Sequence, residues 1–149
     1  MIYGSQIAAT EMIKQGHGAI YSMEGLGSNN MIQLKTILYG TTKHALTYFM
    51  KGIAKELEET NVIAGRLSPG MMLTDFITKT PDGDQSEVIA NSRFKKVFNI
   101  LADKPEAVAR FFVPRMLTNT KNNAQIIWLT NRKVIWRFVT AGFRKDKLL

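Results

Sequence analysis

Tyr39 and Lys43 stand four residues apart in the segment Tyr39-Gly40-Thr41-Thr42-Lys43. In a helix, both side chains lie on one face, one turn from each other. An ammonium group near a phenol favours the phenolate, so such a tyrosine can give or take a proton near neutral pH. This spacing also occurs often by chance, and a partly buried tyrosine beside a solvated lysine is the structural alternative. The chemistry therefore depends on what the rest of the chain places near the pair.

The pair falls at the start of the clearest predicted helix, residues 38–58. Its apolar residues follow the i, i+3, i+4 spacing of one helix face; they are Leu46, Phe49, Met50, Ile53 and Leu57. Gly52 lies inside this helix, where glycine costs roughly 1 kcal/mol against alanine. We therefore expect a close helix–helix contact at Gly52.

Short apolar segments at 19–23 and 61–67 predict two strands that flank this helix. A strand–helix–strand unit is normally parallel, with a right-handed crossover. Ligands bind outside the carboxyl ends of the strands in open α/β sheets. The segments 24–30 and 68–75 follow the two strands, so we expect both of them at one ligand-binding rim.

The remaining elements complete an alternating α/β pattern. Helices are predicted over 2–15 and 94–101, with a last strand over 124–130. A further helix is expected to begin with Asp103 as its cap and to kink or end at Pro114. The polar residues 76–92 are expected to be irregular and to form a mobile lid over the rim.

Composition excludes several classes of protein. The 149 residues include no cysteine, which removes disulfides, thiol catalysis and thiolate metal sites. His17 and His44 are too few for a histidine-built metal site and are expected to face solvent. No apolar run reaches the length of a membrane span, and the amino terminus lacks the layout of a signal peptide. A cytoplasmic location is the expectation.

The net charge of +8 is concentrated at the carboxyl end. Residues 132–149 carry +5, which leaves about +3 for the rest, so the body is not a basic nucleic-acid surface. A helix over 132–147 would place cations on one face, opposite apolar residues; the cations are Lys133, Arg137, Arg144 and Lys147, and the apolar residues are Val134, Ile135, Phe138 and Val139. Such a stripe suits an anionic membrane surface or a solvated face of a packed terminal helix.

These features, in this order, resemble the classical short-chain dehydrogenase/reductase family. The resemblance is carried by the strand 19–23, by Tyr39 to Lys43 with Ala45-Leu46 after it, and by Ser68-Pro69-Gly70 with Thr74 four residues after the glycine. It extends over essentially the whole chain. It implies the carboxyl-terminal half of a Rossmann-like doubly wound parallel sheet, in which 1–149 form a single partial domain.

Within the family, the chain resembles the chlorophyll b reductase branch. The segments that carry this likeness are 21–28, 98–100, 105–110 and 113–116, together with the basic tail. This likeness leaves the substrate open.

The resemblance also implies roles for individual residues. Tyr39 would be the proton donor or acceptor at a small-molecule carbonyl or alcohol. Lys43 would lower the pKa of Tyr39 and bind the nicotinamide ribose of NAD or NADP. Four residues would line the nicotinamide end of the cofactor: Pro69, Gly70, the Met72 backbone and the Thr74 hydroxyl. Family members commonly dimerise through the helix at 38–58, which implies a homo-oligomer.

The chain departs from the family pattern in two ways. The family's catalytic serine stands about thirteen residues before the tyrosine, where this chain reads Glu24-Gly25-Leu26; neither Ser22 nor Ser28 is assigned the role. The glycine-rich turn that holds the cofactor pyrophosphate is also missing from the sequence. We therefore expect a truncated fragment of a reductase that is inactive alone. The alternatives are a non-catalytic remnant or dimerisation partner, and a peripheral membrane-surface protein.

Overall fold

The fold is taken from a computed structural model that describes residues 1–32, 34, 36–80, 82–143 and 148–149. The chain packs as two compact units. The first contains Met1–Ser68 and Pro114–Ile126, and the second contains Pro69–Val113 and Ile127–Leu149. Each unit is described by itself below.

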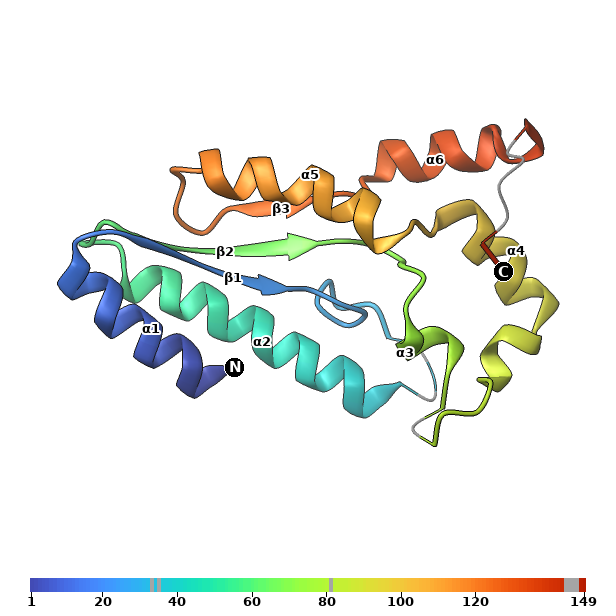
Figure 1. Ribbon diagram of the computed structural model, residues 1–149, viewed down its shortest axis with the longest axis horizontal. Coiled ribbons are helices and arrows are strands. Elements are labelled where there is room, and N and C mark those ends of the chain that lie inside the picture. The colour runs from blue at the N-terminus through green and yellow to red at the C-terminus, as the bar shows by residue number, and fades with distance from the viewer. Residues whose placement is uncertain (33, 35, 81, 144–147) are drawn as a thin grey trace. The chain divides into compact units, whose positions relative to one another are not determined.

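The first unit is built on a parallel sheet (Figure 1). Strands β1 (Gly18–Met23), β2 (Val62–Ser68) and β3 (Gln125–Ile127) lie in the order β1-β2-β3. The register runs from Gly18 opposite Val62 to Met23 opposite Leu67. Because β1 and β2 end at the same edge, the segments that follow them also start there. The predicted parallel α/β fold is confirmed, although β3 is shorter than the predicted strand 124–130.

Two helices cover one face of this sheet, α1 (Ile2–Gln15) and α2 (Ile37–Glu56) (Figure 1). The core between them and the sheet contains Ile20, Met50, Ile53, Ala54, Leu57, Val62 and Ala64. The predicted apolar face of α2 is therefore confirmed. Gly52, in contrast, is exposed, and a Cβ there would meet open space. The expected helix–helix contact at Gly52 is absent from the described part of the chain.

The second unit is mostly helical. Its elements are α3 (Asp75–Thr78), the short 3-10 turn η1 (Glu87–Ala90), α4 (Ser92–Leu101), the first part of α5 (Pro105–Thr118), α6 (Asn131–Val139) and η2 (Ala141–Phe143). Phe98, Ala102, Val108 and Phe112 form its buried apolar centre. The helix α5 continues to Thr118, so Pro114 does not end it.

A buried ion pair ties the parts of this second unit together. Nη2 of Arg137 donates to both carboxylate oxygens of Asp103, at 2.9 and 2.7 Å, and Nη1 donates to the Leu101 carbonyl at 2.7 Å. The Trp128 indole N–H donates to Asp103 at 2.6 Å. The expectation that Asp103 serves as a helix cap missed this network, which crosses 34 residues of sequence.

The same ion pair corrects the expected orientation of the terminal helix. Arg137, predicted on the solvated basic face, is buried, whereas Trp136 and Val139 are 66% and 71% exposed. The other predicted apolar residues Ile135 and Phe138 are exposed as well. Arg144 and Lys147 lie outside the described residues. No helix in the described part of the chain is long and apolar enough to span a membrane.

The segment 76–92 is more ordered than predicted. It contains the end of α3, an antiparallel bridge between Lys79 and Gln85, and the turn η1. The Thr80 N–H donates to the Asp84 carbonyl at 2.8 Å, and the Ser86 N–H donates to the Thr78 carbonyl at 2.9 Å. Pro81 lies outside the described residues. The expectation of irregular structure is therefore wrong for the described part of this segment.

Candidate active site

Tyr39 and Lys43 occupy the first two turns of α2. Both side chains are half-buried, and the Lys43 Nζ lies 5.7 Å from the centre of the Tyr39 ring. The predicted placement of the two side chains on one helix face is thus confirmed. The Lys43 ammonium also donates to the Met23 carbonyl at 3.2 Å, at the carboxyl end of β1. This contact fixes the ammonium at the edge of the sheet where ligands bind in this class of fold.

The loop after β1 lies against the start of α2 through two glycines. A Cβ on Gly25 would lie 2.6 Å from the Tyr39 hydroxyl oxygen and 3.0 Å from Lys43 Cε. Gly27 has a φ of +97°, and a Cβ there would lie 2.6 Å from the Gly40 Cα. Since real Cβ atoms do not approach other heavy atoms so closely, side chains at these positions would displace the tyrosine, the lysine or the helix backbone.

Hydrogen bonds lock this loop to the helix. The Ser28 hydroxyl accepts the Gly25 N–H at 3.1 Å and donates to the Lys43 carbonyl at 3.4 Å. The His44 Nδ1 lies 3.2 Å from the Gly27 carbonyl oxygen. His44 and His17 are both exposed, as predicted. Together these contacts join the loop to the first turns of α2.

Both serines near the loop make hydrogen bonds within the described part of the chain. Ser22 is buried in β1, and its hydroxyl donates to the Met1 sulfur at 3.5 Å. Ser28 bonds to the loop and helix backbones as described above. Neither serine is assigned a catalytic role.

Partial burial affects the pKa of Tyr39. Burial of the phenol raises its pKa above the ordinary value of 10.0, because a phenolate loses more hydration than a neutral phenol does. The role expected of Lys43, lowering the pKa of Tyr39, stays a prediction. The Lys43 ammonium stays 5.7 Å from the ring centre, and its bond to Met23 holds it there.

The second set of predicted site residues belongs to the second unit. Pro69 is buried, and Gly70 adopts a φ of +73°, where a Cβ would lie 2.6 Å from the Leu129 Cβ. Met72 forms a bridge with Asp103, supported by a Leu73 N–H to Asp103 carbonyl bond of 3.0 Å. Thr74 precedes α3, and its carbonyl accepts the Ile77 N–H at 3.0 Å. The segment 69–74 is thus a defined turn braced by Leu129 and Asp103.

The close approach of Gly25 and Gly27 to α2 was not predicted from the sequence. Residues 24–30 were expected to form a loop whose backbone a ligand can approach. In the structure this backbone approaches Tyr39, Lys43 and Gly40. Two glycines two residues apart, directly after a strand, were the only available signal, and their partners lie more than ten residues further along the chain.

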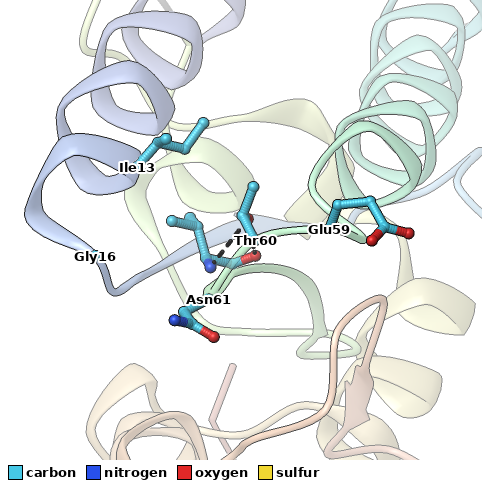
Figure 2. Close-up of a pocket in the computed structure, with 6 residues that line it drawn as sticks. Ile13, Gly16, Glu59, Thr60 and Asn61 are labelled. Carbon is cyan, nitrogen blue, oxygen red and sulfur yellow. Dashed lines mark hydrogen bonds between the residues drawn. The ribbon is translucent and has the colours of Figure 1, made fainter.

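A cavity lies at the amino ends of β1 and β2, and it is not part of the candidate site. Figure 2 shows this cavity of about 240 Å³, lined by Ile13, Gly16, Glu59, Thr60, Asn61 and Val62. Gly16 precedes β1 and Asn61 precedes β2, so the cavity is at the amino ends of the strands, away from the usual ligand edge. No group of three histidine, aspartate or glutamate side chains able to hold a metal ion occurs in the described ranges.

Comparison with known proteins agrees with this geometry. A family model described as short chain dehydrogenase matches residues 1–85. The chain is 32% identical over 141 residues to the probable chlorophyll(ide) b reductase NYC1, chloroplastic, of Arabidopsis thaliana, a match that covers 93% of this chain and 27% of that protein. It is 28% identical to the chlorophyll(ide) b reductase NOL, chloroplastic, of the same plant, covering 94% of this chain and 41% of that protein.

Solved structures show the same fold. A 7α-hydroxysteroid dehydrogenase complexed with NADH and 7-oxo glycochenodeoxycholic acid superposes with a TM-score of 0.64 at 22% identity, over 85% of this chain and 49% of that one. The chain therefore spans between about a quarter and a half of the length of these proteins. With its family model matched over more than half of its residues, the chain belongs to the short-chain dehydrogenase family.

Proposed function

We propose that this chain supplies the catalytic half of a NAD(P)-dependent reductase that interconverts a small-molecule carbonyl and alcohol. The observation that supports this most directly is the pairing of a half-buried Tyr39 with Lys43 at the carboxyl end of β1. A protonated phenol at this edge of the sheet can donate a proton to the oxygen of a carbonyl that is being reduced.

The residues of the chain fit one end of a nicotinamide cofactor. An ammonium group has three N–H donors, and Lys43 uses one of them on the Met23 carbonyl, which leaves donors for the ribose hydroxyls. Pro69, Gly70, the Met72 backbone and the Thr74 hydroxyl would line the nicotinamide. A bound NAD or NADP would supply the hydride. The selection between NAD and NADP is not assigned to any residue of the chain.

In the proposed reaction, Tyr39 gives its proton to the substrate oxygen as negative charge develops there. Lys43 keeps the phenol in place and offers positive charge to the phenolate that forms. Gly25 keeps the space around the hydroxyl small enough to fix its direction. We propose that residues 76–92 act as the substrate lid. The named activity of the plant relatives makes a chlorophyll(ide) carbonyl one substrate to assay, beside simple ketones and aldehydes.

Fluorescence titration of the purified chain with NADH and NADPH tests the cofactor part of this proposal. Saturable quenching that is lost in Lys43→Ala would support it. If neither cofactor changes the fluorescence at millimolar concentration, the remnant or dimerisation-partner alternative replaces it.

In that alternative the chain associates through α2, whose Tyr48 is 80% exposed and whose Gly52 meets open space. Light scattering of the chain, with Gly52→Leu as the interface variant, tests that association.

The exposed face of the terminal helix favours a second candidate function, contact with a membrane surface. Ile135, Trp136, Phe138 and Val139 are exposed on α6, and Phe143 follows them in η2. Exposed tryptophan and aliphatic residues beside cations such as Arg132 are typical of interfacial helices. Sedimentation with anionic liposomes tests this role; equal recovery with neutral and anionic lipid, or with Trp136→Ser, would contradict it. A cytoplasmic location stays a prediction.

A further inference from the structure

Side chains from the three strands of the first unit meet at one buried carboxylate. Glu24 directly follows β1, and its N–H donates to the Leu67 carbonyl of β2 at 2.7 Å. Nη1 of Arg66, also from β2, donates to Oε1 of Glu24 at 3.4 Å, and the Gln125 amide of β3 donates to Oε2 at 2.7 Å. Glu24 and Arg66 are only 7% and 8% exposed. We call Glu24, Arg66 and Gln125 the Glu24 cluster.

The place of this ion pair in the fold is unusual. Arg66 lies on the same face of β2 as Val62 and Ala64, which belong to the apolar core shared with α2. Apolar replacements of buried ion pairs are often neutral or stabilising, so the pair is not explained by its contribution to stability. It does provide a fixed geometry, because each of its hydrogen bonds requires a particular direction.

The backbone on either side of Glu24 contacts both residues of the candidate site. The carbonyl of Met23, the preceding residue, accepts from the Lys43 ammonium at 3.2 Å. The following residue, Gly25, lies so close to Tyr39 that a Cβ would be 2.6 Å from the hydroxyl oxygen. A movement of Glu24 would therefore disturb the contacts of Lys43 and of Tyr39 together.

From this arrangement we propose that Glu24 is a positioning residue for the candidate site. Its carboxylate, held by Arg66 and Gln125, fixes the start of the loop after β1, and this loop confines the Tyr39 hydroxyl. Glu24 itself is assigned no contact with substrate or cofactor. The effect on Tyr39 is a property of the folded chain, whereas its consequence for turnover rests on the proposed reductase function.

Gln125→Leu tests this assignment without changing any charge. Gln125 is exposed, so leucine there should leave the fold intact while it removes the amide that donates to Glu24. Glu24→Gln is the second variant, because a side-chain amide offers one acceptor oxygen where the carboxylate offers two. Gln15→Leu is the matched control, because Gln15 is also exposed in the first unit and its amide donates locally, to the His17 carbonyl at 3.0 Å.

The readout is the ring resonance of Tyr39 in NMR spectra of the 149-residue chain with labelled tyrosine. The chain has four tyrosines, and Tyr39→Phe identifies the resonance that belongs to Tyr39. Tyr3 and Tyr48 are 81% and 80% exposed and serve as internal references. We expect Gln125→Leu and Glu24→Gln to shift the Tyr39 resonance and to lower the pH midpoint of its phenol, because a less confined phenol gains hydration. The control variant should change neither.

Kinetics separate this assignment from the proposed function. In the longest natural protein that contains this chain, Gln125→Leu should lower kcat for carbonyl reduction roughly tenfold, since misplaced catalytic groups lose rate steeply. KM should stay within about twofold, because the loss concerns the proton transfer and not substrate binding. If the wild-type protein reduces no carbonyl, the proposed function fails, and the Tyr39 resonance still decides whether Glu24 positions the phenol.

Two kinds of result would overturn the proposal. A Tyr39 resonance and midpoint that stay unchanged in both variants would show that the Glu24 cluster does not position the phenol. Equal shifts of all four tyrosines, or the same Tyr39 shift in Gln15→Leu, would show a general loosening of the fold instead. If Glu24→Gln fails to fold, as the loss of dispersed resonances would reveal, Gln125→Leu alone decides the question.

Discussion

A Cβ atom on Gly25 would lie 2.6 Å from the Tyr39 hydroxyl oxygen, so the loop after β1 and the phenol share a space that only glycine leaves open. Gly25 and Tyr39 are 14 positions apart in the sequence, and the fold brings them into contact. Because the same Cβ would lie 3.0 Å from Lys43 Cε, the glycine confines both members of the pair. The position of the proton donor is therefore set by the loop as well as by the helix.

We predict that Gly25→Ala moves the phenol and lowers turnover of the longest natural protein containing this chain roughly a hundredfold, since misplacements near 1 Å have this effect on catalysis. The measurement is steady-state reduction of a carbonyl substrate, with circular dichroism to check folding. Unchanged turnover in the folded variant would show that the loop does not position Tyr39.

Gly52→Ala provides a matched control and a prediction of its own. Gly52 is exposed inside α2 and a Cβ there meets nothing within 4 Å. Removing the conformational freedom of glycine should raise the free energy of unfolding by about 0.5–1 kcal/mol. Urea denaturation measures this. A loss of stability accompanied by dissociation of an oligomer would instead place Gly52 in a tight interface between two copies of the chain.

The Asp103–Arg137 pair should be essential to the second unit. Both side chains are nearly buried, at 12% and 10% exposure, so removal of one partner leaves a buried charge. We predict that Asp103→Ala costs about 3 kcal/mol or more of unfolding free energy. Asp75→Ala removes an exposed carboxylate paired with Lys79 at 3.0 Å and should cost less than about 1 kcal/mol. Similar losses in the two variants would contradict the buried network.

The pKa of Tyr39 gives a pH-dependent prediction. Because burial raises this pKa above 10.0, the contribution of the neutral phenol to stability is complete below pH 10.0 and is lost as pH rises through the folded-state value. Ultraviolet absorbance of the phenolate, taken as wild type minus Tyr39→Phe, should show a midpoint above 10.0. A midpoint below 10.0 would mean that the Lys43 ammonium outweighs burial.

The sequence was sufficient to predict the elements that carry the site. Apolar spacing identified α2 and both long strands, because their buried faces follow the helical and strand periods directly. Periodicity did not identify the orientation of α6. There it placed Arg137 in solvent, because the partner that makes burial of this cation possible, Asp103, is distant in sequence.

Only part of the candidate site was predictable from the sequence. The spacing of Tyr39 and Lys43 placed them on one face, as the structure confirms. The direction of the Tyr39 pKa shift was not predictable, since it depends on the burial of the phenol in the folded chain. The contacts of Gly25 and Arg66 were also hidden, because each joins segments that only the folded sheet brings together.

The proton transfer assigned to Tyr39 is tested most directly by Tyr39→Phe in the longest natural protein that contains this chain. Single-turnover reduction of a carbonyl substrate is followed beside the affinity for NADH and NADPH. The account predicts that the rate falls by at least a hundredfold, the usual scale of general acid catalysis, while cofactor affinity stays within about twofold. A variant that reduces its substrate at the wild-type rate would contradict the assignment of Tyr39 as proton donor.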